Sequence, residues 1–262
     1  MITTIAVANQ KGGTGKTTTT VVLGHGLALA GLRVLIVDTD VQGHVAKALG
    51  MKKGPGIRRL VDQAQFGDQL LIVAARERLD VIPSDRSTAA AKRALTTMDF
   101  RERVLADALA GIAASYDVAV IDCAPSVDVL HVASLVAADW LVIPCALDYL
   151  AVDGVNEMLA LVLEIRRRAP EEAPNLLGIL PVFLDRRMNE TMVQLQILAE
   201  TFGKLVLPPV PVDAKLRESP AFGKTIWEYA PRGRGVLGVL ENGRRYGGYA
   251  QFVERVREAA QL

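Results

Sequence analysis

Gln10-Lys11-Gly12-Gly13-Thr14-Gly15-Lys16-Thr17-Thr18 is the stretch of this 262-residue chain that decides its fold class. An apolar run over residues 2–8 precedes it, and apolar residues at helical spacing follow it as far as a glycine at position 31. This order predicts a strand, a glycine-rich loop and a helix. Glycines let backbone N–H groups approach phosphate oxygens, and the helix N-terminus adds a partial positive charge. We therefore expect phosphate binding by Gly12, Gly13, Thr14, Gly15, Lys16, Thr17 and Thr18.

Two lysines flank the glycines and need separate explanations. Lys16 stands where a lysine neutralises the β- and γ-phosphates of a nucleotide, and the Thr17 hydroxyl is placed to hold Mg²⁺. The strict pattern G-x-x-x-x-G-K-[ST] is not met, because its first glycine would fall on Gln10. A glycine-rich turn beside a solvated lysine is the alternative. Neither interpretation explains Lys11.

The segment Lys-Gly-Gly-x-Gly-Lys-Thr resembles the deviant Walker A motif of the ParA/MinD group of ATPases. Asn9-Gln10 ahead of it is similar to the ParA partition branch of that group. The resemblance implies a P-loop NTPase that binds ATP and Mg²⁺ and forms a sandwich homodimer with ATP. It gives Lys11 a catalytic role beside Lys16, because the first lysine of the motif reaches the phosphates bound to the partner.

Acidic residues follow two of the predicted strands. Asp38-Thr39-Asp40-Val41-Gln42-Gly43 resembles the family's D-x-D-P-Q-G segment, with Val41 in place of proline. The resemblance implies that Asp40 is catalytic and orients or activates the attacking water. Asp122 ends an apolar run in the form of a Walker B segment, and we expect it to hold Mg²⁺, directly or through water, with Thr17 and Asp40. Helix capping is the alternative role for Asp38 or Asp40.

Near-continuous apolar runs alternate with helical segments along the chain. They predict an α/β fold with a doubly wound, mostly parallel sheet and helices on both faces. The expected strands are 2–8, 34–38, 79–83, 118–122, 140–144, 176–182 and 204–207. The expected helices are 17–30, 43–49, 87–95, 99–114, 127–137, 151–168, 189–201 and 248–260. We expect a single domain over 1–262, without the N-terminal helix-turn-helix domain of longer ParA proteins, and an inserted loop or hairpin at about 231–248.

Composition limits the classes of protein that remain. The chain has 30 Lys and Arg against 29 Asp and Glu, a net charge of +1, so nucleic-acid binding would need a local basic patch. Cys123 and Cys145 lie in apolar, strand-like contexts, which indicates buried free thiols in a reducing cytoplasm. No apolar run reaches the ~18 residues that cross a bilayer, and no basic leader precedes the first strand. We expect a cytoplasmic protein with no membrane partner.

The second half of the chain resembles ParA segments that contact the adenine and DNA. The stretch that begins at position 211 resembles the family's P-R-N-V-R-L-S-E-A-P-S-x-G-K, which implies that the adenine is lined by Pro211, Val212 and Asp213. By the same resemblance, the DNA-binding residues are Arg187, Lys215 and Arg217. Solvated surface charges are the alternative for these residues. For Arg232, Arg234, Arg244 and Arg245, both DNA contact and a solvated surface stay open.

These features lead to the hypothesis of a ParA-type ATPase for plasmid or chromosome partition. An ATP-dependent dimer would bind DNA non-specifically on the nucleoid, and hydrolysis stimulated by a ParB-like DNA-binding partner would release it. The alternatives are a ParA-like ATPase that positions a protein cargo, a MinD-like ATPase that binds lipid through residues 249–262, and a metabolic relative such as an iron–sulfur protein or an amide-forming synthetase. Two acidic and two basic residues in that C-terminal segment favour a packed helix over a lipid anchor.

Overall fold

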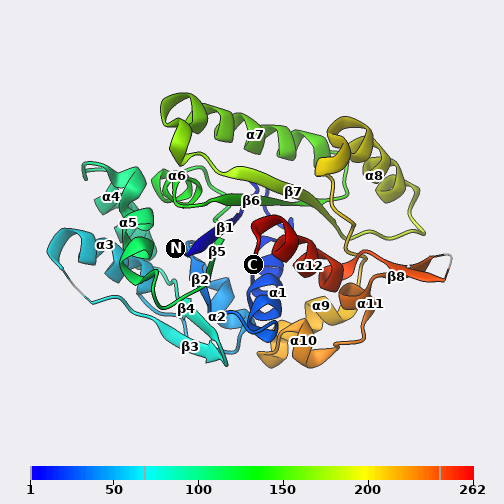
Figure 1. Ribbon diagram of the computed structural model, residues 1–262, viewed down its shortest axis with the longest axis horizontal. Helices are drawn as coiled ribbons and strands as arrows, with labels where there is room; N and C mark the ends of the chain where they lie inside the picture. Colours follow the sequence, from blue (N-terminus) through cyan, green and yellow to red (C-terminus); the bar gives the residue numbers. More distant parts are fainter. Residues whose placement is uncertain (1, 68, 242) are drawn as a thin grey trace.

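A seven-stranded sheet runs through the centre of the computed structural model, which describes residues 2–67, 69–241 and 243–262 (Figure 1). In spatial order its strands are β3 (Val73–Arg76), β4 (Leu79–Ile82), β2 (Val34–Asp38), β5 (Val118–Asp122), β1 (Thr3–Val7), β6 (Trp140–Ala146) and β7 (Asn175–Val182). All neighbouring pairs are parallel except β3–β4. The doubly wound, mostly parallel sheet predicted from the sequence is confirmed.

Helices cover both faces of this sheet. The longer ones are α1 (Lys16–Leu29), α3 (Gly56–Phe66), α4 (Thr88–Leu95), α5 (Val104–Ile112), α6 (Val129–Val136), α7 (Ala151–Arg168), α8 (Asn189–Phe202) and α12 (Gly248–Ala260). The shorter ones are α2 (His44–Ala48), α9 (Ala214–Glu218), α10 (Ile226–Tyr229) and α11 (Arg234–Leu237), with 3-10 turns η1 (Arg101–Arg103), η2 (Pro170–Glu172), η3 (Gly203–Leu205) and η4 (Ser219–Phe222). Within the described residues, none of the helices is both long enough and apolar enough to span a membrane.

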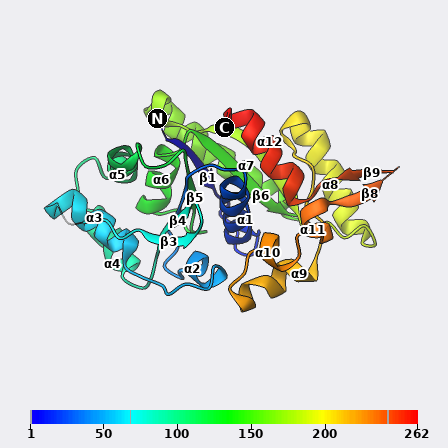
Figure 2. The same cartoon turned by 60° about the horizontal axis from the view of Figure 1, so that its bottom comes forward.

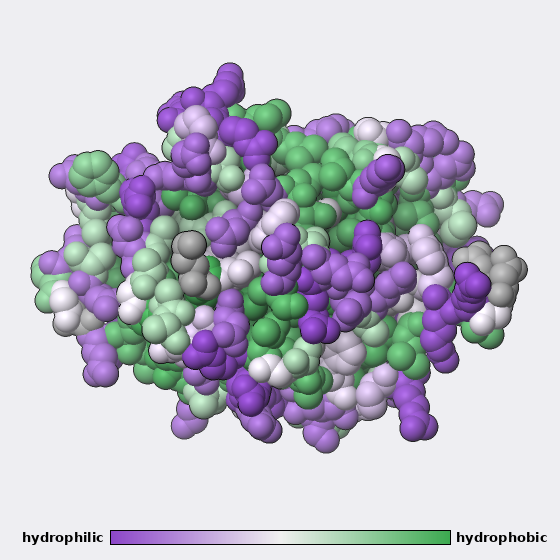
Figure 3. All heavy atoms as spheres, viewed as in Figure 1, coloured by the Kyte–Doolittle hydropathy of each residue, from purple (hydrophilic) through white to green (hydrophobic). Residues whose placement is uncertain are grey.

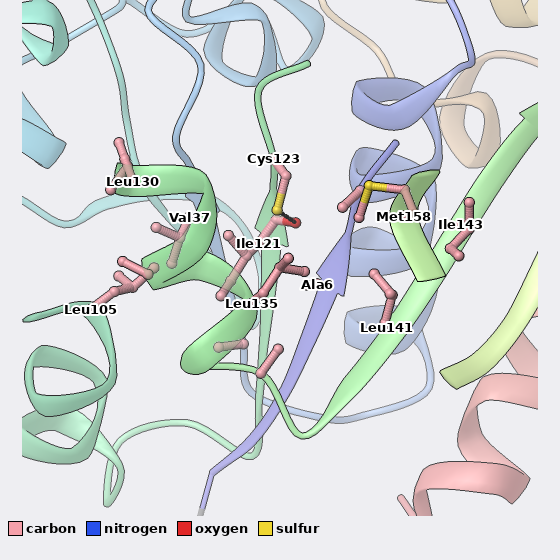
Figure 4. Close-up of a cluster of buried hydrophobic side chains, with 14 of the residues drawn as sticks. Ala6, Val37, Leu105, Ile121, Cys123, Leu130, Leu135, Leu141, Ile143 and Met158 are labelled. Atoms are coloured by element: carbon pink, nitrogen blue, oxygen red, sulfur yellow. Dashed lines mark hydrogen bonds between the residues drawn. The ribbon is translucent and has the colours of Figure 1, made fainter. Parts of the chain in front are cut away.

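Alternate residues of the strands pack into two apolar cores, one on each face. In β1 and just beyond it, Ala6 and Ala8 join the core under α3 to α8, whereas Ile5 and Val7 join the core under α1 and α12. Figure 4 shows the first core, where side chains of Met158, Leu105 and others from the helices meet strand residues. Because a strand buried on both faces has apolar residues at nearly every position, these runs were readable in the sequence.

Some elements differ from the sequence prediction. Residues 204–207 are not a strand, because they form η3 and then a single bridge from Val206 to Ile179. Two prolines follow at 208 and 209 and offer no N–H group to a neighbouring strand. The helix expected at 99–114 is divided into η1 and α5. Helix α3 and the antiparallel edge strand β3 were not predicted.

Residues 231–248 contain α11 and a two-stranded antiparallel sheet, β8 (Val239–Glu241) and β9 (Arg244–Tyr246). This pair is separate from the main sheet. Figures 1 and 2 show it projecting from the end of the molecule near α8 and α11. We call the pair of strands β8 and β9 the hairpin.

Candidate functional site

The glycine-rich loop joins the end of β1 to the start of α1. Gly13 and Gly15 have φ angles of 76° and 79°, which side chains rarely adopt, so glycine is required for this turn. Gly15 is the N-cap of α1, and no side chain caps that helix. The first N–H groups of α1 are therefore available to an anion, with the helix dipole behind them.

Beside this loop lies a cleft of about 420 Å³, at the carboxyl ends of three neighbouring strands. Its described lining consists of the loop residues Gly12, Gly13, Thr14, Gly15, Lys16, Thr17 and Thr18, together with Asp40, Gln42, His44 and Pro125. The strand register explains this gathering, because Asp122 at the end of β5 is paired with both Val7 and Asp38. Ligands bind at this edge in open parallel sheets.

Lys16 is largely buried at the floor of the cleft. Its Nζ donates a hydrogen bond of 2.6 Å to the backbone carbonyl of Lys11. Burial lowers the pKa of the Lys16 ammonium, and the nearby Asp122 opposes this shift. A lysine that has lost much of its hydration gains more from an anionic ligand than an exposed one does.

Asp122 is buried and is held by two threonines of α1. Thr17 Oγ1 donates to Oδ2 at 2.7 Å and Thr20 Oγ1 donates to Oδ1 at 3.2 Å. Burial raises the pKa of the Asp122 carboxyl to about 7, and the charge of Asp40 adds to the shift. A cation in the cleft would favour the ionised carboxylate. Hydroxyl and carboxylate oxygens are the ligands that Mg²⁺ prefers, so the group fits this ion.

Asp38 and Asp40 have different surroundings. Asp38 is buried and accepts the backbone N–H groups of Asp40 and Val45, both at 3.1 Å, so it fixes the turn and the start of α2. Burial and the nearby Asp122 raise the pKa of the Asp38 carboxyl. Asp40 accepts the N–H of Gln42 at 2.9 Å and lines the cleft. Asp40 is therefore the one of the two that a ligand could contact.

Lys11 is held away from the cleft beside it. Its Nζ donates to the backbone carbonyl of Leu150 and lies 3.9 Å from Asp148 Oδ1, just before α7. Gly154 of α7 faces its stem, since a Cβ there would lie 3.1 Å from Lys11 Cδ. Lys11 is not among the described residues that line the cleft. In the single chain its side chain therefore lies against α7 and the residues just before that helix.

Pro211, Val212 and Asp213 are not part of the described cleft lining. The N–H of Val212 donates to the carbonyl of Leu184 at 2.9 Å, beside the end of β7. Asp213 caps α9 and also accepts the N–H of Gly235 at 2.8 Å. Phe183, which the sequence did not single out, is nearer the loop, since a Cβ on Gly15 would lie 3.7 Å from its ring.

The three candidate DNA-binding residues lie on segments that adjoin one another. Backbone bonds of Leu184 to Val210 and Val212 join the loop of Arg187 to the segment that leads into α9 with Lys215 and Arg217. All three side chains are exposed. Arg187 is paired with Asp185 at 2.7 Å and Lys215 with Glu218 at 2.8 Å.

Sequence reasoning missed several residues of the site. Thr20 lies one helical turn after Thr17 and could have been found from that spacing. Gln42, His44 and Pro125 reach the cleft because they follow β2 and β5 at the same edge of the sheet. Gly154 gave no local signal, because its role depends on where α7 lies relative to β1.

Comparison with known proteins gives relatives over most of the chain. A family model described as an AAA domain matches residues 2–174. The chain is 37% identical over 242 residues to the sporulation initiation inhibitor protein Soj of Bacillus subtilis (strain 168), covering 90% of this chain and 95% of Soj. It is 35% identical over 245 residues to the chromosome partitioning protein ParA of Myxococcus xanthus (strain DK1622), covering 92% of this chain and 86% of that protein.

Two solved structures have similar folds. Apo McdA from Cyanothece has a TM-score of 0.82 at 21% identity and covers 99% of both chains, a likeness that concerns the fold alone. A cobyrinic acid a,c-diamide synthase from Mycobacterium smegmatis with bound ADP and magnesium has a TM-score of 0.73 at 30% identity, and covers 88% of this chain and 97% of that one.

Proposed function

The chain belongs to the Soj/ParA family of AAA-domain ATPases, and from this premise we propose that it is a partition ATPase that works as an ATP-dependent homodimer on DNA. The dimer binds DNA without sequence preference, and a DNA-bound, ParB-like partner stimulates hydrolysis and so releases it. The observation that carries the proposal is the arrangement of Lys16, Thr17 and Asp40 at one cleft beside an uncapped helix N-terminus, with Asp122 hydrogen-bonded to Thr17.

ATP binds through the glycine loop in this proposal. Backbone N–H groups from the loop and the first turn of α1 contact the phosphates, and Lys16 exchanges its bond to the Lys11 carbonyl for one to a phosphate oxygen. Thr17 and Asp122 hold Mg²⁺, which neutralises charge on the β- and γ-phosphates. The 2.7 Å hydrogen bond from Thr17 Oγ1 to Asp122 Oδ2 supports this pairing.

Asp40 orients the attacking water. It lies at the cleft surface, whereas Asp38 is occupied by two backbone N–H groups. In phosphoryl transfer the protein chiefly positions groups and stabilises charge, so one oriented carboxylate yields only weak intrinsic hydrolysis. A partner that improves this geometry or adds a cation would raise the rate.

Lys11 completes the site of a partner subunit. To do so it must leave the Leu150 carbonyl and Asp148, so the two-chain state replaces contacts that the single chain makes. DNA binding then depends on ATP because a dimer presents two copies of Arg187, Lys215 and Arg217. Each phosphate contact releases counterions, and doubling the contacts raises affinity steeply.

The test measures dimerisation and binding of double-stranded DNA with Mg²⁺ and either ATP or ADP, over a range of salt. The ATP state is expected to dimerise and bind DNA with an affinity that falls with salt, and the ADP state is not. Lys11→Ala should lose both properties, whereas the control Arg168→Ala, which removes an exposed cation at the far end of α7, should keep them. Equal DNA binding in ATP and ADP, or normal dimerisation and hydrolysis by Lys11→Ala, would refute the mechanism.

An amide-forming synthetase is the second candidate, because the cobyrinic acid a,c-diamide synthase is 30% identical to the chain. For a synthetase, the rate of ATP hydrolysis should depend on a carboxylate substrate and an ammonia donor. It should not change when DNA is added. A cluster-carrying protein is disfavoured, since Cys123 and Cys145 are buried and burial raises the pKa of both thiols to about 12. A lipid anchor is disfavoured because Tyr249, Phe252 and Val256 of α12 are buried in the core.

A further inference from the structure

Glycines let the base of the hairpin pack closely against neighbouring backbone. Gly238, Gly247 and Gly248 have φ angles of 73°, 77° and 80°. A Cβ on Gly247 would overlap the carbonyl oxygen of Pro209, and one on Gly238 would overlap that of Tyr246. The N–H of Gly248 donates to the Pro209 carbonyl at 3.0 Å. The backbone of Gly247 and Gly248 thus packs directly against the backbone of Pro209, in the segment that leads into residues 211–213.

Beyond this base the hairpin is exposed on both of its faces. Leu240 is paired with Arg245, and Glu241 with Arg244. Because successive residues of a strand point to opposite faces, each face carries one arginine. Leu240 is 69% exposed and Tyr246 44% exposed. An isolated two-stranded hairpin has little stability of its own in water, so its contacts at the base keep it in place.

Basic residues continue from the candidate DNA surface toward this hairpin. Arg232, Arg234, Arg244 and Arg245 are all exposed. Helix α11 is joined to α9 by the bond from Gly235 to Asp213, which brings Arg234 near the base of the helix that carries Lys215. The hydrogen bond from Arg187 lowers the pKa of the Asp185 carboxyl, and the charge of Arg234 adds to this shift. Figure 3 shows hydrophilic side chains around this projecting end.

We propose that the hairpin is a DNA-contacting arm, with Arg244 and Arg245 on phosphates beyond the reach of Arg187, Lys215 and Arg217. The inference rests on the proposed function and extends its DNA surface. Guanidinium groups pair well with phosphate oxygens, and a two-stranded ribbon is narrow enough for the major groove. Exposed arginines on both faces suit a ribbon that lies between two phosphate backbones. The rigid base matters because a loose arm would lose more entropy on binding.

The test compares the variant Arg244→Ala/Arg245→Ala with the matched control Arg167→Ala/Arg168→Ala, which removes two adjacent exposed arginines from α7. Binding of double-stranded DNA is measured with Mg²⁺ and ATP at several salt concentrations. Each phosphate contact contributes about 0.9 to the slope of log K against log salt. The hairpin variant lacks four arginines per dimer, so its negative slope should be shallower than that of the wild type by roughly 3 to 4. The control should keep the wild-type slope.

Dimerisation with ATP and basal hydrolysis should be unchanged in the hairpin variant, and Arg244→Lys/Arg245→Lys should retain most of the slope. A wild-type slope in the double alanine variant would overturn the inference and leave the proposed function intact. So would binding of the wild type to vesicles of anionic lipid that disappears in this variant while DNA binding persists. If the wild type shows no ATP-dependent DNA binding, the proposed function fails, and the arm fails with it.

Discussion

Lys11 and Lys16 belong to one loop but are held by different neighbours. Lys16 lies in the cleft, whereas Lys11 is bound by residues about 139 positions away, at the start of α7. The contact is possible because residue 154 has no side chain. The Lys11 side chain can either keep its contacts with Leu150 and Asp148 or enter the partner's site. The balance between these two states would determine the dimerisation constant.

Gly154→Ala should weaken the contacts that the Lys11 side chain makes beside α7. The new Cβ would lie 3.1 Å from Lys11 Cδ and 3.2 Å from Cε, so the lysine must move, while the fold gains slightly because alanine favours a helix. The lost hydrogen bond to a charged group is worth roughly 1.5 kcal/mol, about tenfold in an equilibrium constant. Because each dimer releases two Lys11 side chains, we expect dimerisation with ATP at roughly a hundredfold lower protein concentration, measured by analytical ultracentrifugation.

The control for this prediction is Gly111→Ala, near the end of α5, where a Cβ meets nothing within 4 Å. This change alters helix propensity without affecting Lys11. Coincident dimerisation curves for the two variants would contradict the role given to Gly154.

His131 should make the protein sensitive to mild acid. Its Nδ1 lies 2.9 Å from the carbonyl oxygen of Ala124, and its Nε2 is buried with no partner in the described part of the chain. Burial lowers the pKa of His131 below 6.5, and Lys16 and Lys92 add to this, against Asp128 and the Ala124 carbonyl. The unfolded chain therefore binds a proton at a higher pH than the folded one. Stability contributed by the neutral ring is present above pH 6.5 and is lost as the pH falls below it.

His131→Asn removes the titrating group and keeps an amide that can donate to Ala124. Between pH 7.5 and 5.5 we expect the wild type to lose more unfolding free energy than the variant, by at most about 1.4 kcal/mol. Urea denaturation at the two pH values measures this difference. His44→Asn, at an exposed position, should leave the wild-type loss unchanged.

The loop residues of the candidate site could be predicted because one continuous segment carries their pattern. Asp40 and Asp122 could be predicted because each follows an apolar strand, and such strands end at one edge of the sheet. Their roles remain predictions. The surroundings of Lys11, and Phe183 beside Gly15, could not be predicted, because they depend on the placement of α7 and β7.

At the scale of the elements, the position of the hairpin depends on the backbone conformation of a single residue, Gly247. Gly247→Ala should destabilise the protein more than Gly67→Ala, although both glycines have a φ of 77°. Gly67, with ψ of 21°, is in the left-handed helical conformation, which costs an alanine roughly 1 to 2 kcal/mol, whereas Gly247, with ψ of −161°, is in a region that essentially only glycine adopts. A Cβ on Gly67 meets nothing within 4 Å, whereas one on Gly247 overlaps the Pro209 carbonyl oxygen. We expect an additional loss of roughly 1 to 3 kcal/mol for Gly247→Ala, measured by urea unfolding. Equal losses would mean that the base of the hairpin yields freely.

The elements that could be predicted are those with a single clear periodicity. The strands of the central sheet are apolar at nearly every position, and α7 and α12 have the helical spacing of apolar residues. Helix α3 was missed because Gly54, Pro55 and Gly56 at its start are typical of a loop, although Ile57, Leu60 and Val61 have helical spacing. The strand expected at 204–207 was wrong because apolar residues there pack beside β7 without forming a ladder.

For the whole molecule, shifts in the Tm of thermal unfolding should distinguish nucleotide binding from dimerisation. A ligand that binds only the folded state, at about 100 times its Kd, adds about 2.7 kcal/mol of stability. For a chain of this size the gain corresponds to a rise in Tm of roughly 5 to 10 °C with Mg²⁺ and either ATP or ADP. Excess EDTA should remove most of this rise if Thr17 and Asp122 hold the metal. Lys16→Ala should remove it with Mg²⁺ present.

Dimerisation adds a second dependence, because the stability of a dimer rises with protein concentration. The Tm in ATP should therefore increase with protein concentration, while the Tm in ADP should not. Lys11→Ala should keep the nucleotide-dependent rise, since its Nζ is bonded outside the cleft of its own chain. It should lose the concentration dependence, since its proposed contact is with the partner's phosphates. If Lys11→Ala loses the rise itself at every protein concentration, the lysine acts on its own nucleotide and the role in the partner's site is wrong.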